Sequence, residues 1–303
     1  MSGHTGWARS RVLVASAVGY QWFYNGANFV AFKIGGDAIP PIVLAAMRFG
    51  LAAVLILPLA LRHWRLRPAS GSELASAAGL GLVMLICSQT LALLGTHLLP
   101  AGVASVFGSS APIFLALFSW AILRKRLGLR KVCGIALGFV GLALMAYFSY
   151  AGGGFRPLGA ALTLAASASW AAGSLWARRL RLPEDPIVAL AAQLITTALV
   201  LALAVGTTGM FSRVDMSEVP ISAWSALAFL VIASTLVGYT VFLAVNAQVS
   251  PTIANTFNYA APVVALLLSA FLLGERLTLP KLLSAGVALA GVALMVRVSR
   301  EEE

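Results

Sequence analysis

The sequence predicts an all-α integral membrane protein in which ten transmembrane helices form two inverted five-helix repeats. Three observations support this fold class: long apolar segments without charge, an internal repeat, and an uneven distribution of basic residues. Sixty per cent of the 303 residues are hydrophobic and only 10% are charged, whereas soluble domains carry about 25% charged residues. The apolar segments are continuous rather than alternating, so they favour spanning helices over the strands of a β-barrel.

The charge-free segments give the elements in chain order. Two of them are long enough for two helices each: 74–123, which breaks at 96–100, and 219–274, which breaks at 246–251. Because a spanning helix needs about 20 residues, we expect ten helices, near 11–33, 40–61, 73–95, 100–122, 129–150, 157–179, 186–206, 220–245, 251–273 and 279–298. Prolines stand at their starts, where a missing N–H costs least: Pro40, Pro41, Pro100, Pro157, Pro186, Pro220, Pro251 and Pro280.

The chain repeats itself with an offset of about 150 residues. Residues 104–145 align without a gap on 254–295, and 15 of these 42 positions are identical. A duplicated apolar half is an architecture of secondary transporters. We therefore expect one five-helix repeat over 1–150 and a second over 151–303. Because five is odd, the two repeats must insert with opposite orientations.

Basic residues set the expected orientation. With the N-terminus in the cytoplasm, the cytoplasmic segments hold 15 Lys and Arg residues and the outer segments hold 5. This is the positive-inside bias, and it predicts that both termini are cytoplasmic. The net charge of +11 is thereby assigned to orientation and to contact with membrane lipid, and nucleic acid is not expected as a partner.

Few side chains could support catalysis. The three histidines, His4, His63 and His97, lie outside helix centres, no carboxylate lies in the middle of a predicted helix, and no phosphate-binding loop is present. We expect no enzyme activity, no cofactor and no metal. Because proton-driven transporters use intramembrane carboxylates or histidines, a facilitator is favoured over a proton antiporter; Glu73 and His97 would be the relays if water reached them.

Polar and aromatic residues share one face on each of four predicted helices. The stripes are Gln21, Asn25 and Asn28; Ser167, Trp170 and Ser174; Thr235, Tyr239, Phe242 and Asn246; and Asn255, Asn258, Tyr259 and Pro262. Lipid-facing amides are costly, so these faces should point inward. They form either interhelical hydrogen bonds or a cavity with a few polar groups among aromatic rings, as in small-molecule sites.

Two prolines at matching positions of the repeat, Pro112 and Pro262, are expected to interrupt their helices. Interrupted helices in both halves indicate where a substrate binds. We therefore place the substrate site between the two prolines. The expected contact residues are Asn25, Gln89, Trp170, Tyr239, Asn258 and Tyr259.

Arg48 is the one full charge deep inside a predicted helix. Either it bonds neighbouring helices, or it contacts an anion or carboxylate. Aligning Pro41–Val43 with Pro186–Val188 places Gln193 at the matching position. A polar residue at both positions favours a structural role.

Small residues recur on the fifth and tenth predicted helices. Gly134, Gly138 and Gly141 match Ser284, Ala288 and Gly291. Such faces let two helices approach closely. We expect packing within one chain, with a monomer or weak homodimer as the oligomeric state.

Four segments together resemble the EamA-like branch of the drug/metabolite transporter superfamily: Phe23–Phe29, Met47–Phe49, Ser110–Phe114 and Gly274–Thr278. The resemblance covers nearly the whole chain, although 123–126 lacks the Gly-Glu that usually precedes Arg. The chain looks most like bacterial inner-membrane exporters of amino acids and related metabolites, including YddG-type exporters. This resemblance implies a multi-pass protein of a bacterial-type inner membrane that exports its cargo by alternating access through a central cavity.

The leading hypothesis is a secondary transporter that exports small amphiphilic metabolites, with aromatic or apolar amino acids as the expected substrates. Aromatic rings beside amides suit an apolar side chain on a polar backbone. The alternative within transport is a flippase of lipid-linked or glycolipid cargo. A membrane-embedded enzyme is the alternative from another class.

Overall fold

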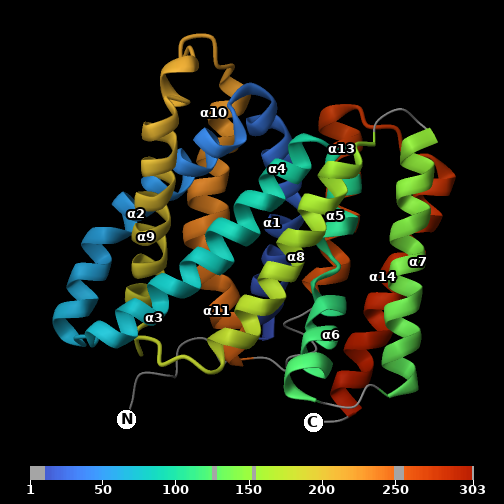
Figure 1. Cartoon of the computed structure of the whole chain (residues 1–303), viewed down its shortest axis with the longest axis horizontal. Helices are drawn as coiled ribbons and strands as arrows, with labels where there is room; N and C mark the ends of the chain where they lie inside the picture. Colours follow the sequence, from blue (N-terminus) through green and yellow to red (C-terminus); the bar gives the residue numbers. More distant parts are fainter. Residues whose placement is uncertain (1–10, 125–127, 152–154, 249–255, 302–303) are drawn as a thin grey trace.

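The computed structural model describes residues 11–124, 128–151, 155–248 and 256–301, and within these ranges every regular element is helical (Figure 1). The elements in chain order are α1 (Arg11–Ala38), α2 (Pro41–Leu66), α3 (Gly71–Gly81), η1 (Leu82–Thr90), α4 (Leu91–His97), α5 (Ala101–Gly108), α6 (Ala111–Leu123), α7 (Leu129–Ala151), α8 (Pro157–Ala177), α9 (Pro186–Thr208), η2 (Phe211–Arg213), α10 (Ile221–Ala228), η3 (Phe229–Gly238), α11 (Tyr239–Gln248), α13 (Phe257–Leu273) and α14 (Leu279–Glu301).

Seven continuous helical stretches of the described residues are long and apolar enough to cross a membrane. They are Pro41–Leu66, Gly71–His97, Ala101–Ile122, Leu129–Ala151, Pro157–Ala177, Pro186–Thr208 and Ile221–Phe242. Helix α13 and the stretch Leu279–Leu294 are apolar but shorter, and the beginning expected for the ninth helix, 251–255, lies outside the described residues. The described residues therefore form the helices of a multi-pass membrane protein.

Two helices continue past the ends that the charge pattern predicts. Helix α1 extends beyond 33 to Ala38, and the Nζ atom of Lys33 lies 3.0 Å from Asp37 Oδ1 one turn later. Helix α2 extends beyond 61 to Leu66 and carries basic residues in its last turn. The prediction ends too early because charged side chains are tolerated at the end of a spanning helix, where they reach the interface.

Two of the stretches contain a π-helical segment that the sequence pattern does not reveal. Segment η1 lies between α3 and α4, and η3 lies between α10 and α11. In each, a threonine hydroxyl donates to the carbonyl five residues earlier: Thr90 to Leu85 at 3.5 Å, and Thr235 to Leu230 at 2.7 Å. Because π-helical turns are rare and concentrate at functional sites, η1 and η3 are candidate parts of a functional site.

Helix α1 crosses the middle of the bundle and packs on α13 and α10 (Figure 1). Glycine permits the approach to α13: a Cβ atom on Gly26 would lie 2.6 Å from the Ala261 carbonyl oxygen. Helix α2 packs on α9, and α8 packs on α4, η1 and α6. These contacts bring both halves of the chain around α1 and α8.

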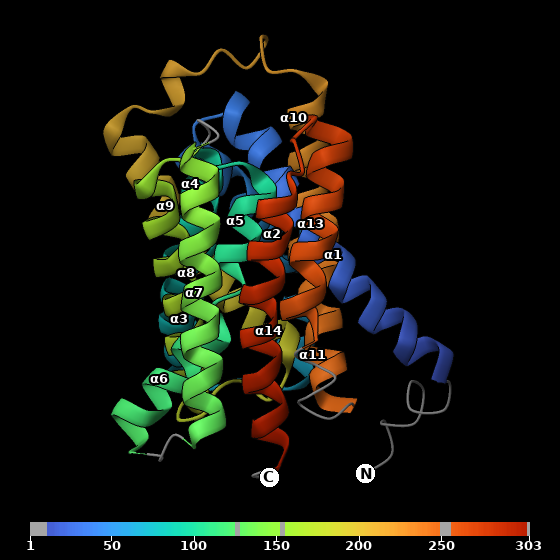
Figure 2. The same cartoon turned by 90° about the vertical axis from the view of Figure 1, so that its right-hand side faces the viewer.

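Helices α7 and α14 lie side by side at one edge of the bundle (Figure 2). As the spacing of small residues predicts, their contact is too close for larger side chains. A Cβ atom on Gly141 would lie 2.2 Å from the Ala288 nitrogen, and one on Gly291 would lie 2.4 Å from the Gly138 nitrogen. The small residues therefore pack the two helices of one chain together.

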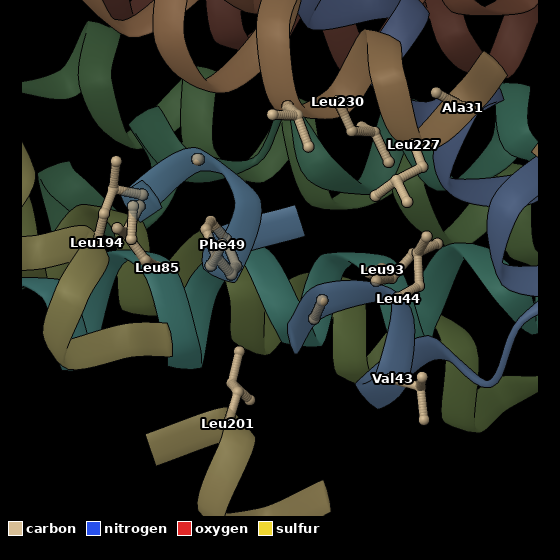
Figure 3. Packing of buried hydrophobic residues seen from close by; sticks show 14 of the residues in the cluster. Ala31, Val43, Leu44, Phe49, Leu85, Leu93, Leu194, Leu201, Leu227 and Leu230 are labelled. Atoms are coloured by element: carbon tan, nitrogen blue, oxygen red, sulfur yellow. The ribbon is translucent and has the colours of Figure 1, made fainter. Parts of the chain in front are cut away.

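Two buried apolar clusters hold the bundle together. The larger one joins α2, α9 and η3 through Leu44, Phe49, Leu194 and Leu230 (Figure 3). The smaller one joins α5, α7 and α14, with the fully buried Met145 among its members. The space between these two clusters is where the candidate site lies.

The segment Gly274–Thr278 has a structural role that its sequence explains. Gly274 ends α13 with φ +66°, a conformation that glycine adopts without strain. Glu275 then accepts hydrogen bonds from the first two backbone N–H groups of α5, those of Ala101 at 2.6 Å and Gly102 at 3.1 Å. At the matching end of α6 the residue is Arg124, which adopts the same left-handed conformation, with φ +52°, although it is not a glycine.

Candidate functional site

A cavity of about 100 Å³ lies between α1, η1, the α5–α6 break, α8 and α13. Eight of its lining residues are polar and uncharged: Asn25, Asn28, Ser88, Gln89, Ser109, Thr163, Ser167 and Asn258. Aromatic rings supply much of the remaining wall: Phe29, Phe32, Trp170 and Phe257. Phe32 belongs to the larger apolar cluster and Phe29 packs against the smaller one. The cavity therefore occupies the seam between the two clusters.

The break between α5 and α6 forms one wall of the cavity. Helix α5 ends at Gly108, and α6 begins three residues later, at Ala111. The Ser167 hydroxyl on α8 donates to the Gly108 carbonyl at 2.9 Å, which satisfies an acceptor at the broken end. A Cβ atom on Gly108 would lie 2.5 Å from the Phe29 ring, so a larger residue here would displace that ring from its place in the cavity wall.

The two prolines expected to mark the site differ in their surroundings. Pro112 is the second residue of α6 and follows the break directly, and its neighbour Ala111 lines the cavity. Pro262 lies inside α13, which begins five residues earlier and continues through it. The expected interruption at Pro262 is therefore wrong. A missing N–H so close to a helix start removes a single hydrogen bond, which packing against α1 can compensate.

Four of the six expected contact residues line the cavity: Asn25, Gln89, Trp170 and Asn258. The Asn25 Nδ2 group donates to the Gln21 carbonyl at 2.8 Å, which fixes that amide along α1. One turn further along the same face, Asn28 is 8% exposed and its Oδ1 atom is buried without a hydrogen-bond partner among the described residues. A buried unpaired amide oxygen carries a desolvation cost, so this oxygen is available to a ligand or to water.

Tyr259 and Tyr239 do not line the cavity. Tyr259 packs against the smaller apolar cluster. It follows Asn258 directly, and adjacent residues of a helix point about 100° apart, so only one of the two can face inward. Tyr239 packs against the larger cluster and is separated from Trp170 by Phe242, whose ring centroid is 6.1 Å from each of theirs. Asn255 and the Asn246 side chain lie outside the described residues.

Arg48 lies behind Phe32, away from the cavity lining. Its Nε and Nη2 groups donate to Thr235 Oγ1 at 2.9 Å and to Ser234 Oγ at 3.1 Å. Its guanidinium carbon lies 5.3 Å from the centre of the Phe32 ring and 5.0 Å from that of Phe49. The side chain is thus buried at a contact between α2 and η3, held by hydroxyl groups and cation–π contacts.

Several lining residues escaped the sequence argument. Asn28 and Ser167 lie on the polar stripes of their helices, so their spacing indicates an inward-facing position, although neither is among the six expected contact residues. Ser88 is adjacent to Gln89 on η1, where the wider π turn changes which residues face inward. Ser109 lines the cavity because the helix breaks there, which a periodic pattern does not show.

The arrangement offers hydrogen-bond donors and acceptors beside aromatic faces. None of the described residues that line the cavity is ionisable. Elsewhere among the described residues, no group of three His, Cys, Asp or Glu side chains could hold a metal ion. The cavity is suited to a small molecule that combines polar groups with an apolar part.

Comparison with known proteins gives matches over nearly the whole chain. A family model for the EamA-like transporter family matches residues 16–147 and again residues 157–297. The chain is 31% identical over 273 residues to the uncharacterized inner membrane transporter YedA of Escherichia coli K12, and the match covers 89% of this chain and 86% of that protein.

Two further matches extend the comparison. The chain is 28% identical over 285 residues to a protein of Escherichia coli K12 named a probable amino-acid metabolite efflux pump, with 89% of this chain and 90% of that protein covered. A solved crystal structure matches with a TM-score of 0.62 and 20% identity, covering 96% of this chain and 99% of the other. That structural likeness supports the fold alone.

Proposed function

The chain belongs to the EamA-like transporter family, and we propose that it exports small amphiphilic metabolites, above all amino acids with aromatic or apolar side chains, through the cavity between α1, η1, the α5–α6 break, α8 and α13. One observation carries this proposal: uncharged amides and hydroxyls, including the unpartnered Asn28 oxygen, stand beside the rings of Phe29 and Trp170. Amides and hydroxyls can bond an amino group and a carboxylate, and the rings can pack on a side chain.

The proposed architecture is ten spanning helices in two inverted repeats, 1–150 and 151–303, with both termini in the cytoplasm. The double match of the family model supports it. So does the packing of helices that correspond in the two halves, because α2 packs on α9 and α7 packs on α14. The matching π-helical segments support it as well.

Transport by alternating access follows from the size of the cavity. A volume of about 100 Å³ is well below the roughly 300–1,000 Å³ of sites that bury a drug-sized ligand. Cargo therefore enters only when the surrounding helices separate. The α5–α6 break and the π-helical segments are where the backbone ladder is already irregular, so they are the proposed places of bending.

We further propose that export is facilitative. The lining carries no ionisable side chain among the described residues, and Glu73 and His97 lie at helix ends, away from the cavity. A protonation step coupled to cargo binding would need a titratable group at the site. Flux should then follow the cargo gradient without a pH gradient.

Counterflow in liposomes tests the proposal. Purified protein is reconstituted into vesicles loaded with unlabelled phenylalanine, and uptake of labelled phenylalanine is followed with and without a proton ionophore. We expect uptake above protein-free vesicles that the ionophore leaves unchanged. No amino-acid uptake together with scrambling of a fluorescent lipid would instead support a flippase, and uptake abolished by the ionophore would overturn the facilitative mechanism.

A further inference from the structure

A second, apolar groove of about 410 Å³ opens on the outside of the bundle between α2, α3 and α9. One face of α2 forms its first wall, through Leu57, Leu61 and Trp64 at helical spacing. Side chains of α3 and α9 form the rest, with small ones such as Ala75 and Ala192 beside larger apolar ones such as Leu74 and Ile195. The groove does not share a lining residue with the central cavity.

The groove lies at one end of the bundle. Helix α2 ends there and α3 begins there after a short turn, while His63 Nδ1 on α2 lies 2.7 Å from Asp185 Oδ2 at the start of α9. Counting from this end at 1.5 Å per residue, the lining of α3 reaches about 10 Å into the bundle and that of α9 about 15 Å. A groove of this depth, open to the side, faces the outer part of one lipid leaflet.

Excess positive charge surrounds this end. Six arginines lie on the last turns of α2 and on the connection from α8 to α9: Arg62, Arg65, Arg67, Arg178, Arg179 and Arg181. Among the described residues, no ion pair joins any of them to a carboxylate. Three carboxylates lie nearby: Glu73, Glu184 and Asp185. Glu73 accepts from the Ser70 backbone N–H at 2.7 Å and interacts electrostatically with Arg181, and Asp185 contacts His63.

We propose that this groove binds one acyl chain of an anionic phospholipid, whose headgroup is held by the arginines at the end of α2, chiefly Arg65 and Arg67. Helical spacing places Arg65 one turn after Leu61, which continues the groove wall toward the headgroup region. Arg67 follows the last residue of α2 directly, at the same end of the groove. Trp64 is 43% exposed at the boundary, where indole rings sit in membrane proteins.

The arginines, rather than the groove, give the site its selectivity. Lipid tails are as apolar as leucine, so an acyl chain gains little by leaving the bilayer for the groove. A basic residue near an anionic headgroup contributes about fivefold in affinity. A second copy of this chain would bring the same six arginines against the first, so like charge disfavours self-association at this end. The site is independent of the transported cargo.

The experiment measures lipid retained by the purified protein. Delipidated protein in detergent is titrated with phosphatidylglycerol or phosphatidylcholine bearing identical acyl chains, and bound lipid is counted by native mass spectrometry. We expect about 25-fold tighter binding of phosphatidylglycerol, about fivefold from each of the two arginines. In Arg65→Gln/Arg67→Gln that preference should fall to near unity, whereas Arg156→Gln/Lys281→Gln, which removes two charges from the opposite end, should retain it.

A second pair of variants tests the groove. Ala75→Trp fills the groove from its exposed rim and should reduce retention of both lipids several-fold, and Ala204→Trp, on a lipid-facing part of α9 outside the groove, should not. Equal binding of the two lipids by the unaltered protein would overturn the proposal. So would equal retention in the two tryptophan variants, or a dimer that only Ala75→Trp disrupts. Because Arg65 and Arg67 are exposed at a helix end, their variant tests the headgroup contact even if Ala75→Trp fails to fold.

Discussion

The π-helical segments η1 and η3 occupy matching places in the two halves but hold different polar groups. With an offset of 145 residues, Thr90 falls on Thr235, and each hydroxyl bonds the carbonyl five residues earlier. On η1, the neighbours Ser88 and Gln89 line the central cavity. On η3, Ser234 and Thr235 instead accept hydrogen bonds from Arg48.

The residues opposite the two segments account for the difference. Arg48 of α2 faces η3, and its counterpart Gln193 of α9 packs against the start of η1, where a Cβ atom on Gly81 would lie 2.8 Å from Gln193 Cα. A buried cation needs acceptors and occupies both hydroxyls of η3. The Gln193 amide instead makes a hydrogen bond with Tyr239, so the polar groups of η1 remain available to the cavity. The same π-helical backbone thus contributes to the cavity wall in the first half, through η1, and holds a buried arginine in the second half, through η3.

Arg48→Ala should have the largest effect. It leaves the acceptors on η3 without their donor and opens a void beside Phe32 and Phe49, which should lower the free energy of unfolding by about 3 kcal/mol. The measurement is thermal unfolding of the purified protein together with its membrane abundance.

Gln193→Leu is the matched control on the η1 side. The Gln193 Oε1 atom is buried without a partner among the described residues, while the same amide makes one hydrogen bond with Tyr239. The substitution removes that one hydrogen bond together with an unsatisfied oxygen, so it should cost less than Arg48→Ala, which removes two hydrogen bonds and a buried cation. Normal folding of Arg48→Ala combined with loss of cargo binding would reverse the assignment and make Arg48 a cargo contact.

Gly81→Ala should destabilise next most strongly, by about 2 kcal/mol. The added methyl group would meet two backbone atoms of Gln193, Cα and O, at 2.8 Å, so η1 would have to move away from α9. Gly50→Ala, within α2, is the control, because nothing lies within 4 Å of its added Cβ and alanine favours a helix. Equal unfolding temperatures for both variants would show that η1 does not depend on this close contact.

Asn258→Ala should impair transport about tenfold while leaving abundance unchanged. It removes one cavity amide, and a hydrogen bond to cargo contributes about 1–1.5 kcal/mol. Tyr259→Phe alters the adjacent residue, which faces the smaller apolar cluster, and should leave transport per folded molecule unchanged. The opposite pattern in counterflow assays would mean that the wrong face of α13 has been placed toward the cavity.

Trp170→Ala should weaken cargo binding by about threefold to tenfold through lost aromatic contact. Trp176→Ala, on the same helix but outside the cavity lining, provides the comparison. A titration of counterflow with aromatic and aliphatic amino acids gives the measurement, and the loss should be greater for aromatic cargo. An equal loss in both variants would point to a general effect on α8.

The sequence predicts the helices well because apolar length and charge are averaged over about 20 residues. It cannot predict η1 and η3, because one wider turn barely changes that average. The stripe argument finds Asn25 and Asn258, whose helices are regular, but includes Tyr259, which lies one residue around the helix. Ser109 lines the cavity because the helix breaks there. The hydrogen bonds from Arg48 to Ser234 and Thr235 span 186 and 187 positions of the sequence. Local patterns do not contain such distant pairs.

The central claim is tested most directly by whether cargo protects a single introduced cysteine, on η1 or on η3, from a thiol reagent. Ser88 on η1 and Ser234 on η3 are similarly buried, at 3% and 5% exposure, and each is changed to cysteine in a Cys87→Ser/Cys133→Ser background. Modification by a membrane-permeant thiol reagent is timed in liposomes with and without the cargo identified by counterflow. The account predicts that cargo slows modification of Ser88→Cys several-fold and leaves Ser234→Cys unchanged; protection of Ser234→Cys alone would contradict it.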